Sequence, residues 1–507
     1  MRRLRRWGWV ALGVSWWLWG ASAWARPGGG QSFGGGHSSS RSGYGGGSSG
    51  GGGGSFFLDL LFFLLISHPL FGIPLLLVAA YMAYRRSSQP VPEGWSTAAT
   101  ATADPLAQAA AAQGSFAGDA LPPRREIEQV KAFDQGFSLS LFEDFLAALY
   151  AQTQDARGKH QLESLATFLA PEVRAALAAS SRQLTAVSEV IVGGLTLVGV
   201  RGLTPEAESV EVEVRLETNF TEASASGERT FWAVELWTLA RKKSARSRPK
   251  GPVDLTRCPS CGAPLDGVKN GVCSYCHQTV NTGDFDWLVT SIVELDRQDR
   301  LAPAAGGVPE DDPPTVRDAD AEANVQALLA RDPQFQWEAL AARVGVIFGE
   351  LQTAWSTLRW EAARPFVTDS LYRAETYWMD RYRKNQQRNI TAHAQLGRVE
   401  LASCTSDAAY DTITLRIYAH GIDYTLDERT SRVIEGSKTA DVHYSEYWTL
   451  VRGVAVTGTA RADKNCPSCG APLQINMAGD CEYCRAHLTS GDFDWVLSRI
   501  EQAAAYS

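Results

Sequence analysis

The sequence lacks the residue patterns that mark the common enzyme classes. It contains no Gly-rich phosphate loop, no Gly-x-Ser-x-Gly turn to carry a nucleophilic serine, and no His-Glu-x-x-His metal-binding helix. Histidine is scarce as well, with eight residues scattered over a chain of 507. These absences argue against a catalytic function, so an enzyme that uses a domain pocket ranks third among the functions considered below.

Positive charge is not in excess. The chain has 48 Lys and Arg residues against 56 Asp and Glu residues, which gives a formal net charge of -8. A protein built mainly to coat nucleic acid carries a basic surface, so this balance argues against nucleic acid as the main partner. The length allows two or three domains, and 45% apolar residues suits a globular protein with a membrane segment.

Cysteine is rare outside two short stretches. Eight of the nine cysteines form two sets of paired Cys-x-x-Cys motifs, and only Cys404 lies outside them. A disulfide framework would consume these pairs and leave an odd thiol, so a reducing compartment is the simpler interpretation. The eight residues are Cys258, Cys261, Cys273 and Cys276 in the first set, and Cys466, Cys469, Cys481 and Cys484 in the second.

Both sets have the spacing of a zinc ribbon. Eleven residues separate the two motifs of each set, and two facing motifs supply the four thiolates that structural zinc prefers. Gly262 and Gly470 follow the second thiolate, where the turn needs a positive backbone angle. We therefore predict two zinc ions per chain. His277 adjoins Cys276, but Arg485 holds the equivalent place in the second set, which argues against His277 as a ligand.

The same aromatic segment follows each set, Gly283-Asp-Phe-Asp-Trp287 or Gly491-Asp-Phe-Asp-Trp495. Its carboxylates, Asp284, Asp286, Asp492 and Asp494, have two interpretations. Paired carboxylates can act as acid and base, but acidic residues are also common helix N-caps. Because both copies follow a predicted ribbon, we expect them to cap a tail helix that packs Trp287 or Trp495 onto it.

The N-terminal region has the features of a targeting segment. Four arginines precede an apolar run that ends at Trp24, and Ala23-Trp24-Ala25 fits a signal peptidase site. Residues 1–25 are therefore expected to be a signal peptide or a first anchor. A Gly/Ser-rich linker follows over residues 26–55.

Residues 56–84 form a second apolar run, longer than the about 20 residues that a spanning helix requires. Its prolines favour a kinked transmembrane segment, with a re-entrant hairpin as the alternative. Arg85 and Arg86 follow it, and the positive-inside rule then places the rest of the chain in the cytoplasm. Residues 87–125 are rich in Ala, Pro, Gln, Ser and Thr and are expected to form a flexible tether.

The remaining chain consists of two similar halves. Ser140-x-x-Glu143 is a capping-box signal for a helix of the first half, and Asp332-Pro333 is expected to open the equivalent helix of the second. Further helices are expected around residues 163–179 and 368–382. The apolar period then changes to two, over Val210–Leu216 and Tyr410–Tyr418, which is typical of half-buried strands. The strands expected to be last contain Glu235-Leu-Trp-Thr-Leu239 and Glu446-Tyr-Trp-Thr-Leu450.

Each half is therefore predicted as helices, then antiparallel strands, then a zinc ribbon. The expected boundaries are a first domain over 126–250, a first ribbon and tail helix over 255–298, a linker over 302–324, a second domain over 325–455, and a second ribbon and tail helix over 463–507.

The second half resembles the C-terminal domain of the mitochondrial inner-membrane translocase subunit 44 family, in particular its bacterial membrane-protein members. The residues that carry the resemblance are Asp332-Pro-x-Phe335, Phe348, Ala354-Trp355, Phe366 and Leu371. In the first half Phe137, Tyr150, Phe168 and Val173 match, but Arg157 stands where the second half has Trp355. The resemblance covers about residues 125–250 and 325–455.

This resemblance implies an α+β fold with two tandem cone domains similar to nuclear transport factor 2, in which helices pack on a curved antiparallel sheet around an apolar pocket. It also implies a tethering or transport function at a membrane. We therefore expect a non-catalytic protein that binds a protein partner or an apolar ligand at the cytoplasmic membrane face. Nucleic-acid or regulatory binding through the ribbons is the alternative.

A cluster of basic residues precedes the first ribbon. It comprises Arg241, Lys242, Lys243, Arg246, Arg248, Lys250 and Arg257. Such a cluster suits anionic lipid head groups, at about 1 kcal/mol per charge near the surface, or nucleic-acid phosphates. A solvated linker explains it equally well. The second half has few basic residues at this place, so any such role belongs to the first copy.

Overall fold

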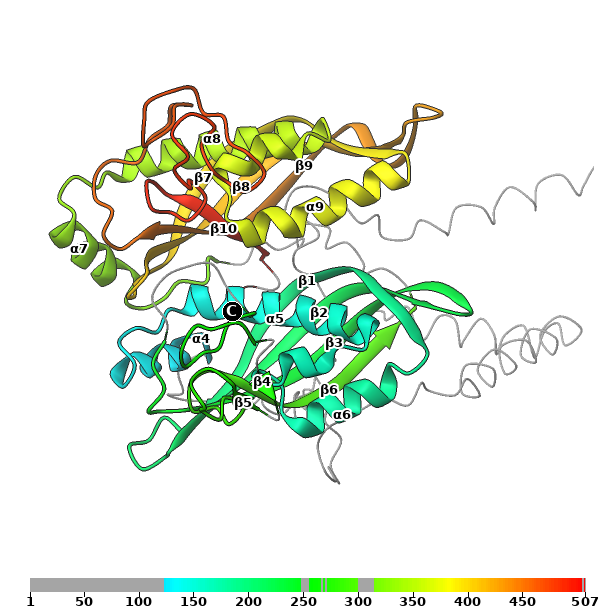
Figure 1. Ribbon diagram of the computed structural model, residues 1–507. Helices are drawn as coiled ribbons and strands as arrows, with labels where there is room; N and C mark the ends of the chain where they lie inside the picture. Colours follow the sequence, from blue (N-terminus) through cyan, green and yellow to red (C-terminus); the bar gives the residue numbers. More distant parts are fainter. Residues whose placement is uncertain are drawn as a thin grey trace, which may run out of the picture. The chain divides into compact units, whose positions relative to one another are not determined.

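The computed structural model describes residues 123–247, 255–265, 268–269, 271–299, 314–503 and 506. They form two repeats of one architecture, a first repeat over 123–299 and a second repeat over 314–506 (Figure 1). The expected signal or anchor (1–25), Gly/Ser-rich linker (26–55), transmembrane segment (56–84) and nearly all of the tether (87–125) lie outside these residues. In the part of the chain that is described, no helix has the length and apolar character needed to cross a bilayer.

The first repeat has helices followed by a four-stranded antiparallel sheet of order β1-β2-β3-β6. The longest helix, α5, contacts β1, and α6 contacts β6. The helical elements are α4 (Pro123–Ile127), η1 (Glu128–Ala132), α5 (Leu139–Lys159), η2 (Leu162–Leu165) and α6 (Pro171–Ser180). The strands are β1 (Leu184–Arg201), β2 (Ser209–Ser224), β3 (Gly227–Lys242) and β6 (Leu288–Gln298), with the short pair β4 (Val268–Lys269) and β5 (Val272–Cys273) between β3 and β6.

The second repeat has the same order of elements. Its sheet is β7-β8-β9-β10, again antiparallel throughout, and α8 and α9 contact β7. The helical elements are α7 (Ala321–Arg331), α8 (Trp337–Ser356), η4 (Trp360–Phe366) and α9 (Asp369–Lys384). The strands are β7 (Gln387–Ser406), β8 (Tyr410–Asp427), β9 (Arg432–Gly453) and β10 (Val496–Gln502). The predicted class, helices with antiparallel sheets in two copies, is confirmed.

Several predicted boundaries need correction. The cap of α5 is Ser138, whose hydroxyl accepts a hydrogen bond from the Leu141 amide, so the helix begins before Ser140. The second long helix begins at Trp337 instead of following Asp332, which is the C-cap residue of α7. The helix expected around 163–179 is divided into η2 and α6, because Pro171 begins a new helix at its first position.

The predicted tail helices are wrong: each segment is a strand. β6 pairs with β3 and β10 pairs with β9, so each adds a fourth strand to its sheet. The apolar residues Leu288, Val289 and Ile292 have helical spacing only because a bulge at Thr290 interrupts the alternation of the strand. Ser498 occupies the same bulge in β10. The strands of Glu235–Leu239 and Glu446–Leu450 are therefore not the last ones.

The space between helices and sheet is filled by large side chains. In the second repeat Trp355, Trp360 and Trp448 are at most 2% exposed and belong to one apolar cluster with residues of α8, η4, α9 and the sheet. In the first repeat Trp237 is fully buried and packs on Tyr150, with ring centroids 5.4 Å apart. Burial of this size stabilises a domain by about 25 cal/mol per Å² of apolar surface. The helix layer and the sheet therefore share one core in each repeat.

Candidate metal centres

Each Cys-x-x-Cys motif forms a tight turn closed by backbone hydrogen bonds. The Cys258 amide donates to the Ala263 carbonyl at 2.7 Å, and the Gly262 amide donates to the Cys258 carbonyl at 2.8 Å. Gly262 has φ of 75°, a left-handed conformation that glycine adopts at little cost. Gly470 has the same φ in the second copy, as its position in the sequence predicted.

The second turn of each set places a residue with a side chain in the left-handed region. His277 has φ of 59°, and Arg485 has φ of 63°. Their amides donate to the carbonyls of Cys273 and Cys481 at 2.9 Å. His277 therefore occupies a turn position that Arg485 fills in the other copy, and it is not part of the cluster of potential ligands.

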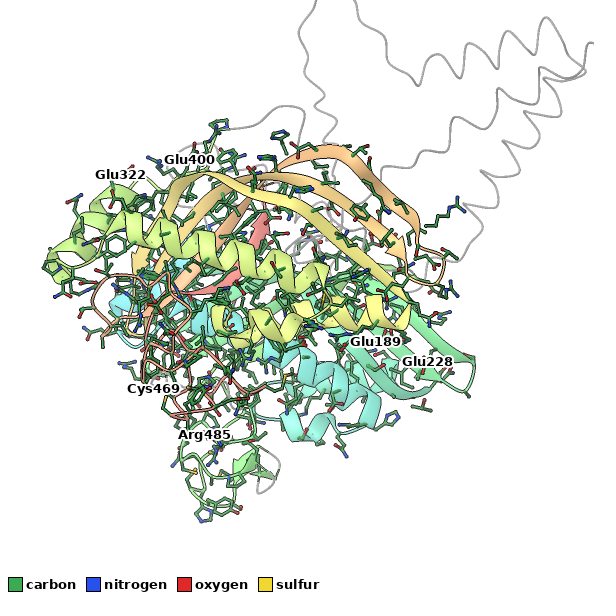
Figure 2. The ribbon with its side chains drawn as sticks, turned by 90° about the horizontal axis from the view of Figure 1, so that it is seen from above. Glu189, Glu228, Glu322, Glu400, Cys469 and Arg485 are labelled. Carbon is green, nitrogen blue, oxygen red and sulfur yellow. The ribbon has the colours of Figure 1, made fainter. Side chains whose placement is uncertain are left out.

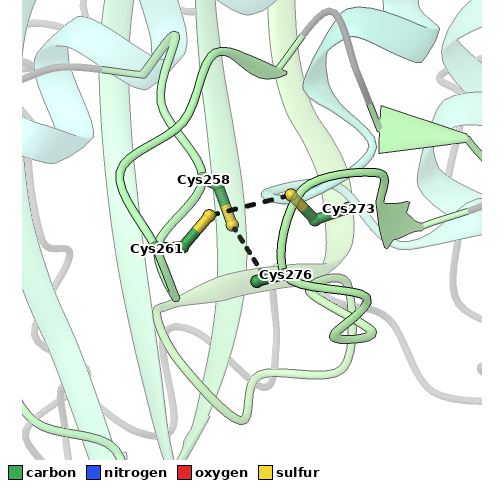
Figure 3. A group of neighbouring side chains, drawn as sticks. All are labelled: Cys258, Cys261, Cys273 and Cys276. Atoms are coloured by element: carbon green, nitrogen blue, oxygen red, sulfur yellow. Dashed lines mark hydrogen bonds between the residues drawn. The ribbon is translucent and has the colours of Figure 1, made fainter.

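The four thiols of each set converge, as Figure 3 shows for the first set. The distances between sulfur atoms are 3.9 Å for Cys258 and Cys276 and 3.9 Å for Cys261 and Cys273. In the second set they are 3.8 Å for Cys466 and Cys484 and 4.0 Å for Cys469 and Cys481. All eight predicted residues are thus brought into two clusters.

These distances suit a four-thiolate metal centre. Zinc–sulfur bonds of about 2.3 Å at tetrahedral angles place the sulfurs about 3.8 Å apart. A disulfide would need sulfurs about 2 Å apart, and all nine cysteines are free. Backbone amides favour a thiolate at one cysteine of each set: hydrogen bonding from Gln278 lowers the pKa of Cys276 to about 7, and that from Ala486 lowers the pKa of Cys484 to about 6, whereas burial raises the pKa of Cys258 to about 12. Both clusters therefore fit a metal ion such as zinc.

The ninth cysteine has a different setting. Cys404 lies on β7 in the core of the second repeat, and burial raises the pKa of its thiol to about 12. Replacing it (Cys404→Ala) should leave the zinc content of the purified chain unchanged, because its sulfur belongs to neither cluster. Elemental analysis checks this, and the loss of one zinc equivalent would refute it.

Each cluster lies within a connection between two paired strands. We call residues 255–287 and 463–495 the first and second four-cysteine loops. Ala240 of β3 is paired with Leu288 of β6, and Val451 of β9 with Val496 of β10, so each loop leaves and re-enters the sheet at one place. The Lys242 and Gly453 amides donate to the carbonyls of Gly283 and Gly491, at 2.9 and 2.8 Å, which closes the base of each loop.

A buried ion pair anchors the exit of each loop. In the first repeat the Arg241 guanidinium lies 2.8 Å from the Asp134 carboxylate and stacks over the Trp287 ring, 4.8 Å from its centroid. Both charged side chains are at most 3% exposed. The ion pair thus joins the segment before α5, the end of β3 and the residue that precedes β6.

The second repeat reproduces this anchor. Arg452 lies 2.9 Å from Asp332 and 4.7 Å from the centroid of Trp495. Asp332 was selected from the sequence as a helix start and as part of the family resemblance, and the two arginines were not assigned to a pair. The repeat itself held the signal, because Arg241 and Arg452 both lie two residues after the matching Trp-Thr-Leu segments.

The acidic residues of the aromatic segments have structural partners. Asp286 and Asp494 accept hydrogen bonds from the amides of Trp287 and Trp495, at 2.9 and 2.7 Å. Asp284 forms an ion pair with Lys242 at 2.6 Å, and Asp492 accepts a hydrogen bond from the Ser490 hydroxyl. These contacts fix the end of each loop. The four residues cap no helix, because the segments that follow are the strands β6 and β10.

Few side chains of the basic cluster are free to bind lipid head groups or other phosphates. Arg241 is buried in the ion pair with Asp134, so its prediction as a lipid-binding residue is wrong. Lys242 pairs with Asp284, and Arg246 donates to the carbonyls of Lys243 and Ala245. Lys243 donates to the Thr204 carbonyl. Arg248 and Lys250 lie outside the described residues. These contacts weaken the case for a phosphate-binding surface beside the first loop.

The two repeats differ at one buried place on the long helix. Trp355 of α8 donates from its indole nitrogen to Asn389 of β7 at 2.8 Å. Arg157, at the equivalent place on α5, forms an ion pair with Glu222 of β2 at 3.0 Å. Both residues join the helix to the sheet, but the first repeat uses a charged contact.

This combination of helices, antiparallel sheet and inserted loop can be compared with known families. Residues 321–461 match the family model of the Tim44-like domain. The matched range begins with α7 and ends before the second four-cysteine loop, so it contains β7, β8 and β9 but not β10. The recognised resemblance is therefore confirmed for the second repeat, whereas the matched range does not include residues 125–250. Among curated proteins, none shows significant similarity to the chain.

Exposed tyrosines occupy equivalent positions in both loops and were not singled out from the sequence. Tyr275 is 60% exposed and Tyr483 is 55% exposed, each directly before the last cysteine of its set. Met477 in the second loop is 66% exposed. In Figure 2, Cys469 and Arg485 mark this loop. The matching Cys-x-Tyr-Cys motifs were the signal that could have identified this surface.

Proposed function

We propose that this protein is a non-catalytic, membrane-anchored adaptor that binds a protein partner at the cytoplasmic face of the membrane. A Tim44-like domain suggests a membrane-associated, protein-binding role. The two four-cysteine clusters would hold zinc ions that keep the loops folded. Transport is the process that the family resemblance implies for such an adaptor.

The observation that carries the proposal is the exposure of apolar side chains on the four-cysteine loops. Among the described residues, the exposed large apolar side chains are Val272, Tyr275, Val316, Ile434, Met477 and Tyr483, and four of these six lie in the loops. Exposed tyrosine and methionine are typical of protein interfaces. The same residue type at one place in both copies favours a binding surface on each loop.

A bound apolar ligand has less support. The interiors of both repeats are filled by large side chains. An open pocket of about 410 Å³ lies between the end of α6 and the hairpin of β2 and β3 in the first repeat, but charged and polar residues line it, among them Arg182, Glu222 and Arg229. An apolar ligand would leave these groups without water, so we favour a protein partner.

Photo-crosslinking tests the proposed surface. A crosslinking amino acid at Tyr275 or Tyr483, in the full chain within its native membranes, should capture the same partner from both positions. The matched control is Ile434, which is 47% exposed and lies on β9 outside the loops. Capture from Ile434 but from neither tyrosine would contradict the proposal.

The proposed orientation has its own test. It rests on the apolar segment 56–84, on Arg85 and Arg86, and on eight cysteines grouped as reduced thiols. A reporter protein that works only in the cytoplasm should be active when it is fused after Ser507. Activity of a reporter that requires the opposite side of the membrane would refute the orientation and the argument for a reducing compartment.

A further inference from the structure

The outer face of the second sheet carries three potential metal ligands on two neighbouring strands. His420 of β8 is paired in register with His443 of β9. Asp441 lies two residues before His443, so the pleat directs both side chains to the same face. Ala419 and Tyr444, the neighbours of the two histidines, belong to the apolar core, which places His420, Asp441 and His443 on the opposite face.

The three side chains meet around a single carboxylate oxygen. Nδ1 of His420 lies 3.0 Å from Oδ2 of Asp441, and Nε2 of His443 lies 3.6 Å from the same oxygen. The two imidazole rings are stacked, with centroids 5.1 Å apart and planes 18° apart. One ligand atom from each residue lies within 4.8 Å of the others. All three therefore surround a common point without a change of strand register.

We propose that His420, Asp441 and His443 form a third metal site, distinct from the four-cysteine clusters, that takes a divalent transition-metal ion such as Zn²⁺. Two imidazoles and a carboxylate are a donor set that such ions prefer. Bonds of about 2.1 Å at tetrahedral angles separate the ligand atoms by about 3.4 Å, and the two distances to Oδ2 of Asp441, 3.0 and 3.6 Å, lie on either side of that value.

The cross-strand pair and the neighbouring carboxylate supply three donors to one ion. A divalent ion would be bound by a lone pair of each imidazole ring and by the Asp441 carboxylate, whose charge it would neutralise. Two described cations of this sheet have other contacts: Lys438 lies over the Tyr424 ring, and Arg398 pairs with Glu400.

The site is open to solvent. The side chains of His420, Asp441 and His443 are 35%, 49% and 75% exposed. Three protein ligands leave one tetrahedral position for water or for a ligand from another molecule. Glu400, labelled in Figure 2, lies on the same face, since its carboxylate accepts a hydrogen bond from Tyr418, two residues before His420. We therefore infer an exchangeable metal ion, in contrast to the four-thiolate clusters, whose four protein ligands leave no open position.

Metal stoichiometry tests this inference on the purified full chain. After dialysis against zinc-free buffer, the four-thiolate clusters account for two zinc ions per chain. Equilibrium dialysis against buffered Zn²⁺ should then add a third equivalent. His443→Ala and Asp441→Asn should each abolish this added equivalent, while the matched control His393→Asn, an exposed histidine on β7 outside the cluster, should retain it.

Folding of the variants is checked by their melting temperatures in zinc-free buffer, which should equal that of the parent because the three side chains are partly exposed. Added Zn²⁺ should raise the melting temperature of the parent and of His393→Asn only. The inference is overturned if the parent gains no third equivalent, or if His443→Ala and Asp441→Asn keep it.

Discussion

Cys466→Ser combined with Cys469→Ser should lower the melting temperature of the second repeat by about 6 °C or more. Two thiolates of the four are lost, so zinc would no longer close the second four-cysteine loop. The folding free energy of so short a loop comes largely from its metal ion. A loss of about 3 kcal/mol or more, at about 2–4 °C per kcal/mol for a domain of this size, gives the expected shift.

The strand pairing predicts which part of the second repeat loses stability. The second loop joins β9 to β10, and Trp495 at its exit is fully buried beside Arg452. A disordered loop would raise the entropy cost of docking β10. Hydrogen exchange of the full chain should therefore accelerate in β10 and in the part of β9 that pairs with it.

The matched control is Cys404→Ala, which removes a thiol without touching a cluster. The equivalent change in the first repeat, Cys258→Ser with Cys261→Ser, should accelerate exchange in β6 and leave β10 unchanged. If the Cys466 and Cys469 variant melts with the parent while β10 keeps its protection, the loop is an independent module and is not a structural part of the sheet.

Asp134→Ala should destabilise the first repeat by about 3–5 kcal/mol, because it leaves the Arg241 guanidinium buried without its ion pair. It also removes the acceptor for the Ser247 amide and hydroxyl. Chemical denaturation measures the change in the free energy of unfolding, and hydrogen exchange in β3 and β6 shows where stability is lost. A loss below about 1 kcal/mol, the range of a surface ion pair, would contradict the assigned role.

The equivalent change in the second repeat, Asp332→Ala, provides a graded comparison. It should cost less, because Arg452 keeps a second carboxylate, Asp411, at 3.5 Å. A double variant that replaces both Asp134 and Arg241 by apolar residues should recover part of the stability lost in Asp134→Ala, because no buried charge is then left unpaired. An equal loss in the single and double variants would assign the effect to packing alone.

The ion pair also predicts a dependence on pH. Burial opposes the ionisation of Asp134, but hydrogen bonds from Ser247 and the charge of Arg241 outweigh it, and the pKa of Asp134 lies below its usual value. Its stabilising contribution is therefore complete above the unfolded pKa of about 3.9 and is lost as the pH falls through the lower folded pKa. The stability difference between the parent and Asp134→Ala should shrink in that acidic range.

The sequence predicted those features that depend on local spacing. Both cysteine clusters have the members that Cys-x-x-Cys spacing selected. The alternation in β2 buries Val210, Val212, Val214 and Leu216, as predicted. These signals are local, since a knuckle turn or a strand face is determined by residues a few positions apart.

The features that the sequence did not predict depend on contacts over long separations or on bulges. The tail helix was inferred from acidic residues that resemble helix N-caps, and the bulge at Thr290 leaves no regular strand alternation in β6 to correct that inference. Asp134 and Arg241 are far apart in sequence, and packing of the segment before α5 on the end of β3 brings them together. His420 and His443 lie on different strands and meet only through the sheet register. Scattered histidines carry no periodic signal before the strand pairing is known.

Zinc content combined with X-ray absorption at the zinc edge tests the central claim most directly. The full chain, purified and dialysed against zinc-free buffer, should retain two zinc ions, each with four sulfur neighbours at about 2.3 Å. The variant with Cys466→Ser and Cys469→Ser should retain one such ion. A parent content of one or none, or a first shell dominated by nitrogen or oxygen, would contradict the assignment of eight thiolates to two metal centres.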